Sequence, residues 1–104
     1  MNTLTLPMQV NDRVCMSIVG QREPYNILRV IEVGSDSCKV YLSLLKKDPL
    51  RVISLDNPLG THLRGKGIVV KVLGIDKGNV ALVFTGEDDI KFRRLQRRES
   101  LSAS

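Results

Sequence analysis

The residues that could do chemistry in this chain are mostly basic, and they gather near its C-terminal end. Residues 91–104 contain five Lys or Arg residues and one acidic residue, whereas residues 1–90 contain 11 basic and 10 acidic residues. A basic excess on one segment is the electrostatic signature expected of a polyanion binder. The alternative is a solvated tail that only keeps the protein soluble, and charge alone does not separate the two.

The run Ile90–Arg94 gives this charge a more specific interpretation. In a β-strand, alternation places Phe92 and Arg94 on one face and Lys91 and Arg93 on the other. The aromatic ring can stack on a single-stranded base, and the guanidinium beside it can pair with a phosphate. Lys91 and Arg93 would attract backbone phosphates. The competing interpretation is that Phe92 is simply a core residue.

Catalytic and metal-binding patterns are missing from the sequence. His62 is the only histidine, so neither a Ser–His–Asp nor a Cys–His arrangement can be assembled. Cys15 and Cys38 lack CxxC spacing and are expected to be small buried hydrophobes in a reducing compartment. The acidic run Glu87–Asp89 is interpreted as a solvated turn. We therefore expect no enzyme activity, cofactor or metal.

The apolar runs and the first residues of the sequence indicate where the protein is located in the cell. The apolar runs are too short to cross a bilayer as helices, and Met1–Leu6 lacks the features of a secretory signal. The sequence therefore predicts a cytoplasmic protein.

An internal repeat organises the chain. The segments that begin at Leu28 and Ile68 align without a gap over 28–55 and 68–95, with shared Gly34/Gly74 turns. The repeat predicts unit one at residues 1–55, a linker loop at 56–67, and a partial unit two with the basic tail at 68–104. A chain that contains two such units is expected to be a monomer that mimics a homodimer.

The pattern of residues predicts an all-β fold, a small barrel or sandwich of about eight short strands, with a short C-terminal helix after about Arg94. The expected strands are short runs rich in Val, Ile and Leu, bounded by Gly, Asp, Asn, Ser or Pro. They are Leu4–Leu6, Arg13–Ile18, Leu28–Val33, Lys39–Leu44, Leu50–Leu55, Ile68–Leu73, Asn79–Phe84 and Ile90–Arg94. The predicted core is Leu28, Val30, Val40, Leu42 and Leu44 with their repeat mates Ile68, Val70, Val80, Leu82 and Phe84.

Two stretches of the sequence resemble a known family. GKGIVVKVLGIDKGNVALVFTGEDDIKFRRLQRRE is similar to the body of the carbon storage regulator (CsrA/RsmA) family of bacterial RNA-binding proteins, and LTLPMQVNDRVCMSI resembles its opening strand pair. The resemblance implies that the first strand, Leu4–Met8, lies beside the last strand, Ile90–Arg94, and that the pair grips RNA. Because Ser54 stands at the equivalent of Arg94 in unit one, it implies one RNA site rather than two.

The resemblance and the charge together predict an RNA-binding translational regulator that binds a messenger leader or a small RNA, single-stranded or in a hairpin loop. The rival interpretation is a degenerate relative that binds a protein partner by a strand edge or by the basic tail. The predicted RNA-binding residues are Leu6, Met8, Lys91, Phe92, Arg93, Arg94, Arg97 and Arg98.

Overall fold

The computed structural model describes residues 1–22, 24–43, 49–63 and 65–95. These residues form nine strands and no helix. The strands are β1 (Asn2–Met8), β2 (Arg13–Ile18), β3 (Tyr25–Val33), β4 (Ser37–Leu42), β5 (Leu50–Ser54), β6 (Leu59–Leu63), β7 (Lys66–Asp76), β8 (Asn79–Gly86) and β9 (Ile90–Leu95). The prediction of an all-β fold is confirmed. The C-terminal helix was predicted for a segment that lies outside the described residues.

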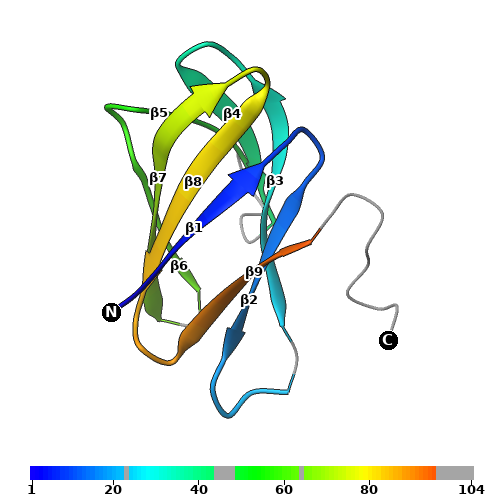
Figure 1. Ribbon diagram of the computed structural model, residues 1–104. Coiled ribbons are helices and arrows are strands. Elements are labelled where there is room, and N and C mark those ends of the chain that lie inside the picture. The colour runs from blue at the N-terminus through cyan, green and yellow to red at the C-terminus, as the bar shows by residue number, and fades with distance from the viewer. Residues whose placement is uncertain (23, 44–48, 64, 96–104) are drawn as a thin grey trace.

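The strands belong to two antiparallel sheets. The four-stranded sheet, which we call sheet A, has the order β1-β8-β7-β6, and the five-stranded sheet B has the order β5-β4-β3-β2-β9. Figure 1 shows the sheets facing each other, with β1 at the edge of sheet A running beside β9 at the edge of sheet B. The chain therefore forms a two-layered sandwich whose edges come together at a β1–β9 seam.

The β7–β8 hairpin shows how local sequence chemistry sets the strand register. Lys77 and Gly78 form its two-residue turn with φ angles of 50° and 80°. Tight hairpin turns with the correct twist need positive φ, which glycine adopts at little cost. The turn fixes Asp76 opposite Asn79, and with this register alternate apolar residues of the two strands, among them Val70, Val72, Val80 and Leu82, face the interior.

The core lies between the two sheets and takes side chains from both. Phe84 of sheet A and Phe92 of sheet B stack across it with ring centroids 5.4 Å apart. Gly86 leaves the space that these side chains occupy, because a Cβ atom there would lie 3.1 Å from both Ile90 Cδ1 and Phe92 Cζ. Nine of the ten predicted core residues are buried, and the tenth, Leu44, lies outside the described residues.

One expectation about the elements needs correction. Residues 56–67 were predicted to be a linker loop, but Leu59–Leu63 form β6, which pairs with β7. The composition of this strand gives little β signal, because Gly60 and His62 flank its one β-branched residue, Thr61. In addition, the third strands of the two repeats behave differently, since β5 stays paired with β4 whereas β9 leaves β8 and pairs with β2.

The described residues contain no helix with the length and apolar character needed to cross a membrane.

Candidate nucleic-acid interface

The β1–β9 seam is closed by side chains rather than by a strand ladder. β1 lies beside β9, as the resemblance implies, although its backbone ladder is with β8. The Arg94 guanidinium of β9 instead donates a hydrogen bond to the Pro7 carbonyl at 2.8 Å, and the Asn2 amide donates to the Ile90 carbonyl at 2.6 Å. Pro7 is tolerated here because β1 is an edge strand.

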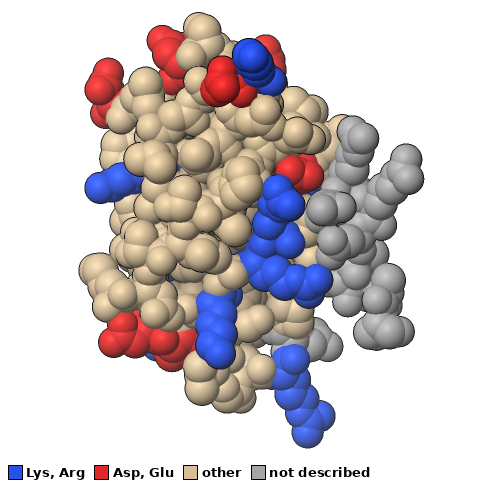
Figure 2. Space-filling model, in the orientation of Figure 1, with Lys and Arg blue, Asp and Glu red and all other residues tan. Residues whose placement is uncertain are grey.

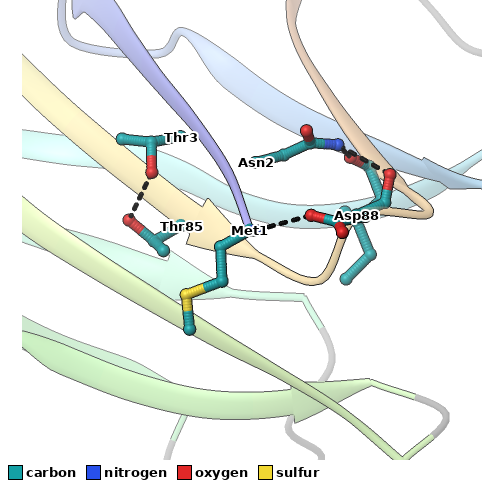
Figure 3. A network of polar contacts seen from close by, with 6 residues as sticks. Met1, Asn2, Thr3, Thr85 and Asp88 are labelled. Atoms are coloured by element: carbon teal, nitrogen blue, oxygen red, sulfur yellow. Dashed lines mark hydrogen bonds and ion pairs between the residues drawn. The ribbon is translucent and has the colours of Figure 1, made fainter.

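Polar contacts at the start of β1 neutralise the acidic turn 87–89 (Figure 3). The Met1 amino group pairs with the Asp88 carboxylate at 2.5 Å, and its hydrogen bond to that carboxylate holds the pKa of Asp88 below its ordinary value. Lys66 pairs with Asp89 at 2.9 Å, and this hydrogen bond raises the pKa of the lysine. No metal-binding cluster of His, Cys, Asp or Glu occurs among the described residues.

Several residues predicted to contact RNA are directed into the protein. Met8 is fully buried, Phe92 is 8% exposed, and Leu6 is partly buried against the core. The interpretation of Phe92 as a core residue is thus the correct one, and its ring cannot stack on an external base. Arg94, also predicted to contact RNA, is half-buried at the seam, where its guanidinium binds the Pro7 carbonyl.

Lys91 and Arg93 meet the expectation of exposed cations on β9. Register places Lys91 opposite Ser17 and Arg93 opposite Cys15 on β2; Lys91, Arg93 and Ser17 are exposed on the outer face of sheet B, whereas Cys15 is buried. The other two predicted cations, Arg97 and Arg98, lie outside the described residues.

Sheet B brings further cations to the same outer face. Arg13 on β2 lies directly opposite Arg29 on β3, and Lys39 on β4 lies opposite Glu32 on β3. Among the described residues that point outward from sheet B, the charged ones are these five basic residues and a single carboxylate. We call this surface the basic face; its charged members are Arg13, Arg29, Glu32, Lys39, Lys91 and Arg93.

The basic face carries an excess of positive charge. Glu32 is its single described carboxylate, and the pair of Glu32 with Lys39 is loose, at 3.8 Å, and exposed. Figure 2 shows Lys and Arg side chains gathered over the region of β2 and β9, whereas the visible surface over sheet A is mostly uncharged, with acidic groups toward its ends. A surface with excess positive charge attracts polyanions and loses affinity as salt is added.

An aromatic side chain stands among these cations. Tyr41 on β4 lies directly opposite Arg29 and is 39% exposed. The Arg29 guanidinium carbon lies 5.9 Å from the centre of the Tyr41 ring, at the outer limit of a cation–π contact. The aromatic ring that we expected beside a guanidinium is therefore present, but it is Tyr41 rather than Phe92.

Sequence reasoning missed Arg13, Arg29 and Tyr41. Each occupies an outward position of a strand with alternating residues, which period-two patterning could have indicated. Their proximity could not be read in the same way, because it depends on which strands are neighbours and on two irregularities in register along β3.

Both cysteines are buried, as predicted. Burial raises the pKa of Cys38 to about 11, which keeps this thiol protonated and unreactive at neutral pH.

Comparison of the chain with protein-family models, with curated proteins and with solved structures finds no match. The resemblance to the carbon storage regulator family stays a prediction from the residues.

Proposed function

We propose that this protein binds single-stranded RNA on the basic face of sheet B and regulates translation through that binding. One observation carries the proposal: five basic side chains and one carboxylate share the outer face of a single sheet. Phosphate contacts supply most of the affinity of such surfaces. The resemblance to the carbon storage regulator family favours RNA as the polyanion and translation as the regulated process.

The shape of the surface favours a single strand over a duplex. A sheet face that combines cations with an exposed aromatic residue suits unstacked bases, as in other single-strand-binding β proteins. Across the five strands of sheet B the face extends for about 19 Å, at about 4.8 Å between neighbours. This distance accommodates a few nucleotides laid across the strands.

The binding surface differs from the one implied by the family resemblance. Met8 and Phe92 are buried and Arg94 binds the Pro7 carbonyl, so the β1–β9 pair offers few side chains to RNA. Selectivity for GGA loops depends on that strand pair in the family. We therefore expect a GGA-loop hairpin and a scrambled hairpin to bind with similar affinity.

The test is a fluorescence-anisotropy titration of labelled RNA at several salt concentrations. If Arg13, Arg29, Lys91 and Arg93 each neutralise one phosphate, log K falls with log[salt] at a slope of about −3 for a single strand. Arg13→Gln and Lys91→Gln should each weaken binding to all RNAs and flatten the slope by about 0.7.

Lys71→Gln is the matched control, since Lys71 is an exposed lysine on the outer face of sheet A, opposite Val83. It removes the same charge from the opposite layer and should leave the slope unchanged. Absence of binding at low salt would refute the proposal. So would a Lys71→Gln variant that weakens binding as much as Arg13→Gln.

A second function is favoured by the apolar edge of sheet B. β5 is an edge strand, and Leu50, Val52 and the following Leu55 are 53%, 56% and 54% exposed. Exposed edge strands with apolar side chains can pair with an extended segment of a protein partner. Charge substitutions at Val52 that leave RNA binding intact but abolish capture of a specific protein would favour this function.

A further inference from the structure

The Arg29–Tyr41 pair stands out on the basic face. Tyr41 is the exposed aromatic residue of this face, and within the described residues its ring contacts one cation, Arg29. One register row crosses all five strands of sheet B and contains Leu95, Arg13, Arg29, Tyr41 and Leu50. In this row Tyr41 lies between two arginines on one side and an exposed leucine on the other.

We propose that Arg29 and Tyr41 form a stacking site for one base of single-stranded RNA, an inference that rests on the proposed RNA binding. The base lies against the Tyr41 ring, and the guanidinium of Arg29 stacks on it from the other side or pairs with the adjoining phosphate. Leu50, 53% exposed and directly opposite Tyr41 on β5, limits the site at the sheet edge.

The geometry of the free pair fits this role. Two stacked contacts of about 3.5 Å each require about 7 Å between guanidinium and ring. The observed 5.9 Å is about 1 Å less, a distance that a rotation of the long, exposed Arg29 side chain supplies. In the free protein the arginine lies over the ring, and in the complex the guanidinium moves about 1 Å further from the ring to admit the base.

The site also sets the direction of the bound strand. Arg13 lies two strands from Tyr41, about 10 Å away across the sheet, and Arg93 and Lys91 lie one strand further on. On the opposite side of Tyr41 the surface becomes apolar at Leu50 and Val52. The backbone therefore extends from the stacked base toward β9, where the cations lie, rather than toward β5.

Intrinsic fluorescence reports on this site directly. The protein has no Trp and two Tyr residues, Tyr25 and Tyr41. Tyr25 packs against the core, and its hydroxyl bonds to the Gln21 side chain, away from Tyr41. In the Tyr25→Phe variant all tyrosine emission comes from Tyr41, and a base stacked on that ring quenches it.

The experiment titrates Tyr25→Phe with a single-stranded RNA of about 8 nucleotides, within the usual footprint of single-strand-binding folds. The comparison probe is a ribose-phosphate oligomer of equal length without bases. We expect both probes to bind, the RNA more tightly, and only the RNA to quench Tyr41. In the otherwise unaltered chain, Tyr41→Ala should weaken RNA binding roughly five- to hundredfold and Tyr41→Phe by no more than about twofold.

The possible outcomes distinguish the stacking site from RNA binding by the basic face. If both probes bind equally and Tyr41 emission does not change, the stacking site is refuted while RNA binding by phosphate contacts stands. If neither probe binds at low salt, the proposed function fails and the stacking site fails with it. Because the quenching measurement keeps Tyr41 in place, it decides the question even if Tyr41→Ala does not fold.

Discussion

Replacing Arg94 tests whether the fold or a ligand uses its guanidinium. The Arg94 guanidinium donates to the Pro7 carbonyl at 2.8 Å and joins the two sheets at the seam. A hydrogen bond from a charged donor contributes about 1.5–3 kcal/mol, and less where water can replace the lost partner. Because this bond lies at a solvent-accessible edge, Arg94→Ala should lower the free energy of unfolding by about 1–2 kcal/mol.

The assay is urea denaturation followed by circular dichroism. Arg94→Ala should lower the midpoint without changing the dependence on urea, since the same surface is exposed on unfolding. Lys91→Ala is the control, because Lys91 is exposed on the same strand, and it should change stability by less than about 0.5 kcal/mol. RNA affinity should respond in the opposite way, falling for Lys91→Ala and changing little for Arg94→Ala. A stable Arg94→Ala variant that no longer binds RNA would contradict the structural role of Arg94.

Four further predictions concern the fold. Leu82→Ala should lower the free energy of unfolding by about 2–5 kcal/mol, because Leu82 is fully buried, and a change below about 0.5 kcal/mol in urea denaturation would mean that it is exposed. Gly86→Ala should lower the free energy of unfolding by about 1–3 kcal/mol, since the added Cβ would lie 3.1 Å from Ile90 Cδ1 and Phe92 Cζ. A thermal midpoint equal to that of the unaltered protein would contradict this crowding. Burial raises the pKa of the Cys38 thiol from 9.0 to about 11. The protonated thiol therefore contributes about 2–3 kcal/mol to the free energy of unfolding below pH 9, and this contribution is lost as the pH rises through 11. Urea denaturation at several pH values should show this alkaline loss in the unaltered protein and not in Cys38→Ala. The chain should sediment as a monomer at micromolar concentration, and a tight dimer would overturn the idea that two repeats in one chain replace a homodimer.

Sequence patterning predicted the strands well where strong periodicity and turn chemistry coincide. Arg13–Ile18 has its predicted bounds, and the Lys77–Gly78 turn lies within the predicted glycine turn. β6 was missed because Gly60 and His62 give it neither alternation nor β-branched density. Its strand conformation comes from pairing with β7, a tertiary effect that overrides local propensity.

The proposed binding surface was harder to predict than the fold because it depends on strand order. The sequence identifies Lys91 and Arg93 as outward cations of the last strand, and the structure agrees. The sequence could not indicate that β9 pairs with β2. Only that pairing brings Lys91 and Arg93 onto the same face as Arg13 and Arg29. The two repeats differ in this respect, since β5 pairs with β4 whereas β9 pairs with β2.

The role of Phe92 shows the same limit at the level of one side chain. Alternation correctly put Phe92 on the opposite face from Lys91 and Arg93, but it could not say which face is the interior. The stacking with Phe84 settles this, because the two rings meet between the sheets. The aromatic residue for base recognition then has to come from another strand, and Tyr41 is the exposed one on the basic face.

In the proposed function sheet B is the binding layer and sheet A supports it, and amide chemical-shift changes on adding single-stranded RNA test this assignment most directly. We predict that the largest changes lie on β2, β3, β4 and β9, centred on Arg13, Arg29, Tyr41 and Arg93, and weaken as salt is added. The outer positions of sheet A, such as Thr5 and Lys71, should not shift. Changes centred on sheet A, or spread evenly over both sheets, would contradict the assignment of the basic face as the RNA-binding surface.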